Sequence, residues 1–285
     1  MRSPICLILL LGLAESLPVA AHGDLHDQID GVTRQISQHP ADAMLYLKRG
    51  ELYRTHRDWE AALNDYARVD RLDPNFTAIE FFRGRMLLEA NRPNPARKSL
   101  DHFLANEPEH AEALIARGRV LAKLGEGEAA ANDFTRALAR LSAPKPEYYL
   151  ERAEALAAGP SGRGAEALRG LDEGMKRLGP VLTLQLRAID LELARTNYAA
   201  ALSRLDPVIA QSPRKESGLA RKGEILQQAG RAEEARESFT AALKAVESLP
   251  PQHRRARAMV RLENRLRATL EQPALALANK ESAKR

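Results

Sequence analysis

The side chains in this sequence that are best suited to chemistry are arginines that return at a regular interval. Five arginines share the pattern: Arg49, Arg83, Arg117, Arg152 and Arg187. The first three are equally spaced, and a ladder of guanidinium groups could bind a run of phosphates. Each arginine, however, is followed by a glycine or alanine, which permits two helices to approach closely. We therefore favour a structural role, in which the guanidinium reaches a carboxylate on a second helix, such as Asp65 or Asp133.

Metal binding is a second candidate chemistry, at the start of the chain. If the leader described below is cleaved before His22, that residue supplies a terminal amine and an imidazole, with His26 four residues further on. Such a set of nitrogens can ligate copper. A frayed segment that leads into the first helix is the simpler interpretation. We expect no bound metal and no other cofactor.

Motifs of known enzymes are absent from the sequence. It contains no glycine-rich phosphate loop, no Gly-x-Ser-x-Gly and no His-Glu-x-x-His. The single cysteine, Cys6, lies within the leader, so the mature chain would lack thiol nucleophiles, thiolate metal sites and disulfides. We predict a protein that is not an enzyme.

The elements that position these side chains are repeats. Pro40, Pro74 and Pro108 recur at the same 34-residue interval as the arginines. Between them, small residues and bulky apolar residues alternate at helical spacing, which predicts a helix, a short turn and a second antiparallel helix in each copy. We expect six copies, over residues 41–76, 77–110, 111–144, 145–180, 181–215 and 216–249.

These copies resemble the tetratricopeptide repeat (TPR) family, which uses this period. The resemblance covers roughly residues 41–249 and is clearest in the first copy, at Tyr46, Gly50, Tyr53, Trp59, Ala62, Tyr66 and Pro74. Glu80 and Pro93 depart from it in the second copy. The resemblance implies an all-α fold, an α-solenoid of about six helical hairpins whose first helices line a concave surface that binds other proteins.

Both ends of the array are predicted to be capping helices. Residues 22–40 carry Leu25, Ile29, Val32 and Ile36 at helical spacing, and residues 250–271 carry the stripe Met259, Leu262, Leu266 and Leu270. Residues 272–285 have no strong periodicity and are expected to form a flexible tail.

Residues 1–21 have the composition of a signal peptide. Arg2 precedes an apolar run from Ile5 to Ala14, and the small residues Ala20 and Ala21 form a cleavage site before His22. The run is too short to span a bilayer. We expect a periplasmic or secreted protein.

The net charge of +5 is concentrated in the C-terminal segment, because residues 251–285 hold nine basic and three acidic side chains. Four arginines fall on the side of the predicted capping helix opposite its apolar stripe: Arg254, Arg257, Arg261 and Arg265. This basic face is either a solvated outer surface or a dock for an acidic partner or an anionic membrane surface. We do not expect nucleic acid binding, because no aromatic residues alternate with the basic ones in the repeats.

The predicted groove has an apolar floor and is basic around its middle. The floor residues are Leu47, Phe81, Ile115 and Leu150. The basic residues beside them are Arg54, Arg85, Arg119 and Lys123, interspersed with Glu51, Glu89 and Glu154. A partner would be an extended peptide or a helix with apolar anchors and some acidic residues. The alternative is that the floor residues pack between neighbouring hairpins, which helical spacing cannot distinguish.

Two functions are therefore considered. The first is a monomeric, exported, non-catalytic scaffold that binds a peptide or helix of a partner protein in its groove. The second is an adaptor or assembly subunit that docks to an envelope complex or an anionic surface through the basic C-terminal helix.

Overall fold

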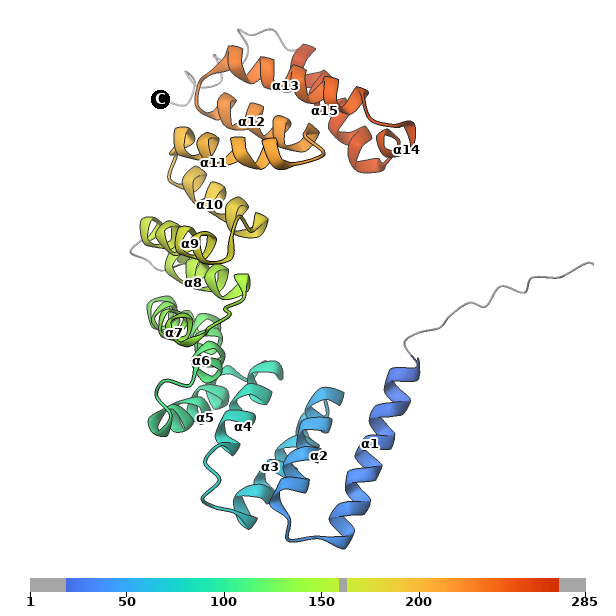
Figure 1. Cartoon of the computed structure of the whole chain (residues 1–285), viewed down its shortest axis with the longest axis vertical. Coiled ribbons are helices and arrows are strands. Elements are labelled where there is room, and N and C mark those ends of the chain that lie inside the picture. The colour runs from blue at the N-terminus through green and yellow to red at the C-terminus, as the bar shows by residue number, and fades with distance from the viewer. Residues whose placement is uncertain (1–18, 159–162, 272–285) are drawn as a thin grey trace, which may run out of the picture. The chain divides into compact units, whose positions relative to one another are not determined.

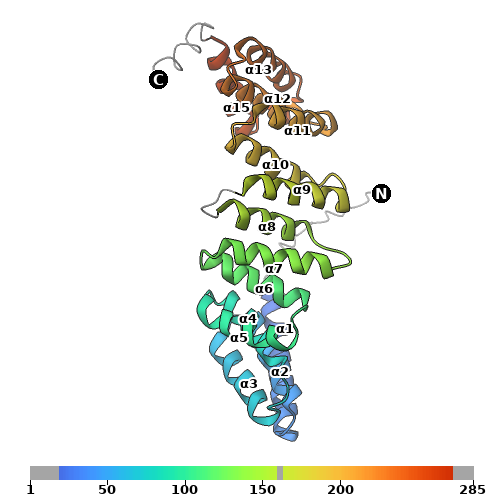
Figure 2. The ribbon, with the colours of Figure 1, turned by 90° about the vertical axis from the view of Figure 1, so that its left-hand side faces the viewer.

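The computed structural model describes residues 19–158 and 163–271. The predicted signal peptide, apart from its last three residues, and the predicted tail lie outside the described residues. Within them the chain forms fifteen helices and no strand (Figures 1 and 2). The helices are α1 (Val19–Gln38), α2 (Ala43–His56), α3 (Trp59–Leu72), α4 (Ile79–Glu89), α5 (Pro93–Asn106), α6 (Ala111–Lys123), α7 (Gly127–Arg140), α8 (Pro146–Ala158), α9 (Gly164–Leu178), α10 (Leu182–Ala194), α11 (Tyr198–Gln211), α12 (Glu216–Gln228), α13 (Ala232–Glu247), α14 (Pro251–Arg254) and α15 (Arg257–Glu271).

Helices α2 to α13 follow one another as six pairs, and the all-α fold class is confirmed. The chain divides into two compact units, residues 1–120 and 121–285, with the boundary inside α6. In the first unit α1 packs on α2, and the pairs α2–α3 and α4–α5 pack against each other through α3 and α4. In the second unit the pairs α8–α9, α10–α11 and α12–α13 are in contact in chain order, and α15 packs on α13.

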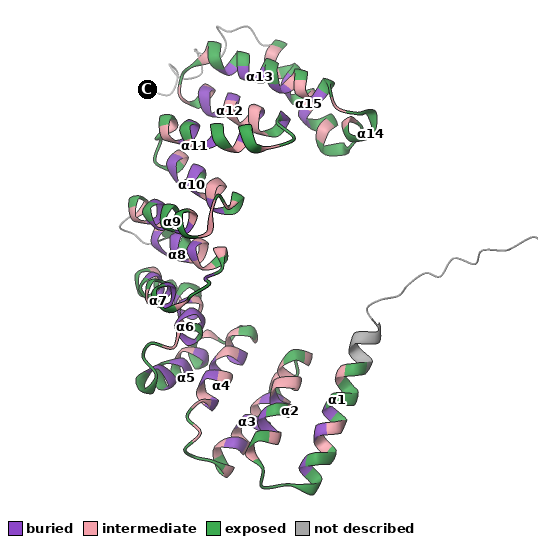
Figure 3. Cartoon of the chain, viewed as in Figure 1, coloured by how far each residue is buried: buried purple, intermediate pink, exposed green. Residues whose placement is uncertain are grey.

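Each unit has its own apolar core, visible as the buried sides of the helices in Figure 3. In the first unit Tyr66, Met86 and Leu100 are fully buried. In the second, Phe239 of α13 belongs to a core that extends to Leu262 and Leu266 of α15. Helix α15 therefore covers the last hairpin as a cap, because its apolar stripe completes that core.

Glycines allow the two helices of a pair to touch. A Cβ placed on Gly84 would lie 2.6 Å from Leu100 Cγ, and one on Gly223 would lie 2.5 Å from Phe239 Cδ1. Both contacts join residues with the same separation along the sequence. The small residue of the repeat thus leaves room for a bulky side chain of the second helix.

The turns inside the hairpins share a backbone conformation that the sequence pattern does not reveal. One residue in each of five turns has a positive φ angle, namely Arg57 (63°), Asn91 (56°), Gly125 (80°), Thr196 (56°) and Gly230 (74°). The first three are separated by one repeat interval each, as are the last two. A left-handed residue after the first helix ends it and reverses the chain. Only two of the five are glycine, which is why this conformation is hidden in the sequence.

The N-terminal cap follows the predicted pattern, because Ile29, Val32 and Ile36 of α1 are buried. The C-terminal cap differs from the prediction of a single helix over residues 250–271. It consists of two helices, α14 and α15, separated at Arg255 and Ala256. The break allows Arg254 to turn back onto α15, where its Nη2 lies 2.6 Å from Glu263 Oε1.

Candidate functional site

The predicted groove floor is mostly core. The side chains of Leu47, Phe81 and Ile115 are only 6%, 8% and 4% exposed, and Leu150 is half-buried. Phe81 packs against the rings of Phe103 and His110, with centroids 5.5 and 5.1 Å away. Leu47, Phe81 and Ile115 are therefore packed among the helices, as the alternative interpretation has it, and offer little surface to a partner.

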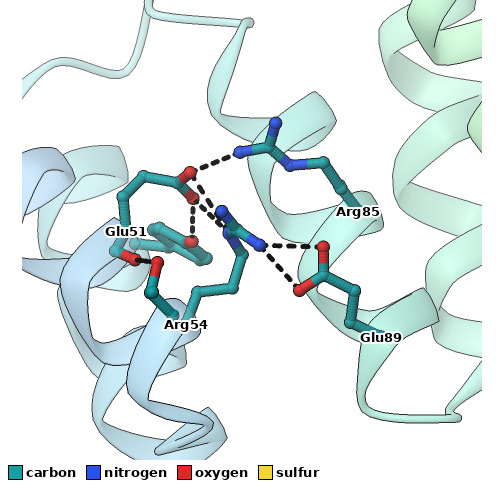
Figure 4. A network of polar contacts seen from close by, with 6 residues as sticks. Glu51, Arg54, Arg85 and Glu89 are labelled. Atoms are coloured by element: carbon teal, nitrogen blue, oxygen red, sulfur yellow. Dashed lines mark hydrogen bonds and ion pairs between the residues drawn. The ribbon is translucent and has the colours of Figure 1, made fainter. Parts of the chain in front are cut away.

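In the first unit, the polar residues beside that floor are joined in a network of ion pairs (Figure 4). Arg54 of α2 lies with its Nη1 2.7 Å from Glu89 of α4, and its Nε 3.2 Å from Glu51. Glu51 also pairs with Arg85 and accepts a hydrogen bond of 2.5 Å from the Tyr66 hydroxyl. Burial, followed by this bond to a carboxylate, raises the pKa of Tyr66, which keeps the phenol protonated.

This network corrects the expectation that the middle of the groove is basic. In the first unit two arginines face two glutamates, so the charges of Arg54 and Arg85 are balanced by Glu51 and Glu89. Of the other predicted basic residues, Arg119 is half-buried and Lys123 is exposed, both on α6. The α2–α4 face is better described as an ion-pair network that joins two hairpins.

Four of the five recurring arginines, Arg49, Arg83, Arg117 and Arg152, have structural partners, as the sequence favoured. Arg49 donates from Nε and Nη2 to the two oxygens of Asp65, at 2.8 and 2.7 Å. Arg152 is buried, lies over the ring of Tyr149, and donates to Glu173 at 2.7 Å. The partnership with Asp65 is thus confirmed, and these guanidinium groups do not form a phosphate ladder.

At other positions in the series, the partner comes from the preceding hairpin. Arg117 reaches Asp101 of α5 at 2.9 Å, and Lys222, which replaces the arginine in the sixth copy, reaches Asp206 of α11 at 2.7 Å. Arg83 pairs with Asp70 and Glu80. The same repeat position therefore ties successive hairpins together in some copies and the two helices of one hairpin in others.

The predicted basic C-terminal face is divided among different surroundings. Arg254 lies on α14 and is paired with Glu263, as described above. Arg265 lies 3.3 Å from Glu224 of α12. Arg257 and Arg261 are exposed on α15, and among the described residues neither forms an ion pair. Of the four arginines, these two are the ones that stay exposed without an ion pair in the part of the chain that the structure describes.

The second unit contains a cleft of about 450 Å³ that the repeat pattern does not predict. It lies between α10, α11 and α12 and the segments that precede α10 and α12. Its lining residues are Pro180, Leu182, Gln185, Leu186, Leu205, Val208, Ile209, Gln211, Ser212, Pro213, Arg214, Ser217, Gly218 and Arg221. Leu182, with 53% of its surface exposed, is one of the few large apolar side chains that face solvent.

A second hollow of about 520 Å³ shares Ser217 and Arg221 with the first and continues toward the C-terminal cap. It has a different chemistry, with acidic and basic side chains facing each other. Its lining residues are Asp190, Ser217, Arg221, Glu224, Ala258, Met259, Leu262 and Arg265. Arg265 is the one residue of the predicted basic face that borders this site.

One sequence feature could have indicated the cleft. In α10, Leu184, Ala188 and Leu191 are the buried residues that the repeat requires. Leu182 is an additional apolar residue that stays exposed, and Pro180 precedes it, whereas Leu186 is partly buried against the core. Extra apolar residues outside the core register mark surface that a partner can cover.

No group of three or more metal-binding side chains is found among the residues that the structure describes. The rings of His26 and His56 are in edge contact, with centroids 4.7 Å apart. The side chain of His22, which the copper hypothesis requires, lies outside the described part. No helix in that part is sufficiently long and apolar to cross a membrane.

Comparison with known proteins supports the fold. The family model described as a tetratricopeptide repeat matches residues 81–146 and 186–250. The chain is a tetratricopeptide-repeat protein. No curated protein matches the sequence.

Three solved structures illustrate the similarity. The C-terminal part of a TPR repeat-containing protein from Cytophaga hutchinsonii is 13% identical, with a TM-score of 0.66 over 85% of this chain and 95% of that one. A tetratricopeptide repeat protein from Parabacteroides merdae is 19% identical, with a TM-score of 0.53 over 87% and 94%. A chain in the structure of Naa15/Naa10 bound to HypK-THB is 16% identical, with a TM-score of 0.52 over 87% of this chain and 37% of that one. These similarities establish the fold of the chain.

Proposed function

We propose that this protein is a non-catalytic scaffold that binds a peptide segment or helix of a partner protein, and that the α10–α12 cleft is the main binding surface. The observation that supports the proposal is the exposed apolar lining of this cleft around Leu182. A hollow of this size with apolar walls and a few polar groups is typical of a binding site.

The scaffold role agrees with the other features of the chain. In the first unit, the arginines and acidic residues that could have formed a catalytic or phosphate site form ion pairs with one another. Rigid helix pairs hold the cleft residues in place, because Leu184 and Ile189 on the other sides of α10 are fully buried. A partner would therefore meet a preformed surface, which limits the entropy lost on binding.

The test compares two apolar side chains with nearly equal exposure. Leu182→Asp places a charge in the cleft, whereas Met44→Asp changes a residue of α2 that is 54% exposed and does not line the cleft. Crosslinking and affinity capture of the mature protein from its own cells should recover a partner with the wild type and with Met44→Asp, but not with Leu182→Asp. Equal recovery by all three proteins would contradict the assignment of the cleft.

We also propose that the protein works outside the cytoplasm, on the basis of the leader in residues 1–21. Cleavage before His22 is the specific expectation. N-terminal sequencing of the protein from fractionated cells tests it. An intact Met1 on cytoplasmic material would contradict it.

A second candidate function is docking to an anionic surface through α15. Arg257 and Arg261 are exposed on this helix beside Val260, which is itself 43% exposed. A basic face with an apolar residue is suited to the surface of an anionic membrane. Sedimentation with vesicles of phosphatidylglycerol should decrease when both arginines are changed to Gln. Sedimentation with phosphatidylcholine vesicles serves as the control.

A further inference from the structure

Both charged side chains in the lining of the α10–α12 cleft are arginines. Fourteen described residues line it, and the only charged ones are Arg214 and Arg221. Arg214 lies in the segment before α12, and Arg221 lies in the second turn of that helix. Each guanidinium is paired with an acidic side chain outside the lining, and its remaining N–H donors make the apolar hollow complementary to an apolar group next to a carboxylate.

Arg214 is held in position by its neighbours and still faces solvent. Its Nε and Nη2 each lie 2.6 Å from a single oxygen of Glu216, a side chain that is only 3% exposed. Its backbone N–H donates to the Ser212 hydroxyl at 3.2 Å, and that hydroxyl donates to the Arg214 carbonyl at 2.6 Å. The arginine side chain nevertheless remains 49% exposed. Because a guanidinium has five N–H donors, others are available to a ligand.

Arg221 is fixed from the opposite side of the cleft. Its Nη2 pairs with Asp190 of α10, and the two side chains are 30% and 50% exposed. Asp190 belongs to the lining of the adjacent hollow and not to that of the apolar cleft. The pair therefore orients the guanidinium at the boundary between the two hollows and leaves further donors for a second carboxylate.

The apolar part of the lining includes the close contact of α12 with α11. A Cβ on Gly218 would lie 2.7 Å from Ile209 Cγ1, so the glycine allows α12 to approach α11 closely at this point. Leu186 and Val208 are half-buried beside the exposed Leu182. A single bulky apolar side chain can cover this part of the lining while its backbone remains within reach of polar groups at the rim.

We infer that the cleft recognises a peptide segment in which a bulky apolar residue stands next to a carboxylate, with the apolar side chain against Leu182 and Val208 and the carboxylate between Arg214 and Arg221. The carboxylate is that of an Asp or Glu side chain, and the C-terminus of the partner is the alternative source that the binding measurements test. This inference depends on the proposed function and names the chemistry of its partner. A basic segment is disfavoured, because it would bring like charges together.

The experiment is a selection of random peptides on the folded, full-length chain. We expect enrichment of Leu, Ile or Phe next to an acidic residue. The same selection on Arg221→Gln should lose the acidic preference and keep the apolar one. Arg231→Gln provides the matched control, because Arg231 is an exposed arginine outside the cleft, paired with Glu234. Arg214→Gln is a second variant, with circular dichroism to confirm that it folds, since it leaves the buried Glu216 unpaired.

Binding measurements then separate the sources of the carboxylate. The best enriched peptide is labelled and titrated by fluorescence anisotropy beside two analogues, one with Asn or Gln in place of its acid and one with an amidated C-terminus. Replacement of the recognised carboxylate should weaken binding about tenfold on the wild type. The same replacement should have little effect on Arg221→Gln.

The outcomes distinguish this inference from the proposed function. The carboxylate inference would be overturned by apolar peptides with no acidic preference, by a preference for a free C-terminus alone, or by an acidic preference unchanged in both arginine variants. Each of these results would leave the apolar cleft as the binding site. Selection that is the same on Leu182→Asp as on the wild type would overturn both. A preference for basic peptides would also contradict the inference.

Discussion

Gly50 of α2 lies directly against the ring of Tyr66 in α3, and a Cβ on this glycine would lie 2.7 Å from Tyr66 Cε1. The two residues have the same separation along the chain as Gly84 and Leu100, and as Gly223 and Phe239. Since Tyr66 also donates to Glu51, this contact connects the packing of the first hairpin to the ion-pair network on its surface.

Gly50→Ala should destabilise the protein by about 1–3 kcal/mol, because the new methyl group overpacks the interface between α2 and α3. The matched control is Gly31→Ala in α1, where the nearest atom to a Cβ is 3.9 Å away. That change should be neutral or stabilising by up to about 1 kcal/mol, because alanine is the better helix former. Urea unfolding followed by circular dichroism measures both. Equal effects at the two glycines would contradict the packing role of Gly50.

The pair Arg49–Asp65 should contribute more to stability than the pairs at the surface. The Asp65 side chain is only 6% exposed, and removing Arg49 as its partner leaves a buried carboxylate without compensation. We expect Arg49→Met to cost about 3 kcal/mol. Arg92→Met is the control, because Arg92 and Glu60 are 48% and 71% exposed, and its cost should be below about 1 kcal/mol.

A double-mutant cycle isolates the coupling between these side chains. The double variant Arg49→Met/Asp65→Asn should lose less stability than the sum of the losses in the two single variants. Each single change leaves one charged side chain without its partner, whereas the double change removes both charges. Additive costs in denaturant unfolding would show that the two side chains stabilise the hairpin independently.

The fold was accessible from the sequence because its main determinants recur at a fixed interval. Gly50, Gly84 and Gly223 are close-packing points that only small residues satisfy, so their positions reveal the phase of the repeat. The left-handed turn residues were not accessible, since Arg57 and Thr196 adopt positive φ angles with no glycine to indicate them. Tertiary packing of the two helices imposes that backbone conformation.

The candidate site was less accessible than the fold. Leu47 and Leu182 are both leucines on first helices, yet Leu47 is 6% and Leu182 is 53% exposed. Helical spacing assigns a residue to a face but does not show whether a neighbouring helix covers that face. The prediction of a basic groove was wrong for a related reason. The partners of Arg54 lie on two helices, and one of them, Glu89, belongs to the next hairpin.

Glu263 should stabilise the C-terminal cap in a pH-dependent manner. Hydrogen bonds from Arg254 and then Arg267 lower the pKa of Glu263 to about 2. Because this is below the value of about 4.3 for an unfolded glutamate, the stabilisation is fully present above that pH and is lost as the pH falls toward 2. Titration of the Glu263 carboxyl by NMR should show the low pKa, and added salt should raise it toward the ordinary value.

Arg254→Gln should raise the pKa of Glu263, because the hydrogen bond from Arg254 lowers that pKa more than the one from Arg267 does. Arg255→Gln is the control. It removes the same charge one residue further on, from a side chain that forms no ion pair with Glu263 in the described structure. An unchanged pKa in Arg254→Gln would contradict the geometry of the break between α14 and α15.

Thr196→Gly should stabilise the protein. Thr196 is a β-branched residue at φ 56° in the turn between α10 and α11, a conformation that costs a non-glycine residue about 1–2 kcal/mol. Glycine relieves this strain, but the greater freedom of the unfolded chain offsets about 0.4–1 kcal/mol of the gain in stability. We expect a net gain of about 1 kcal/mol in urea unfolding.

Gly230→Ala, at the equivalent position of the next hairpin, should have the opposite effect to Thr196→Gly. A Cβ there meets no atom within 4 Å, so any loss comes from its backbone angle of 74°. A loss of stability in Thr196→Gly would show that the turn depends on the threonine side chain, whose hydroxyl donates to the Arg195 carbonyl at 2.7 Å.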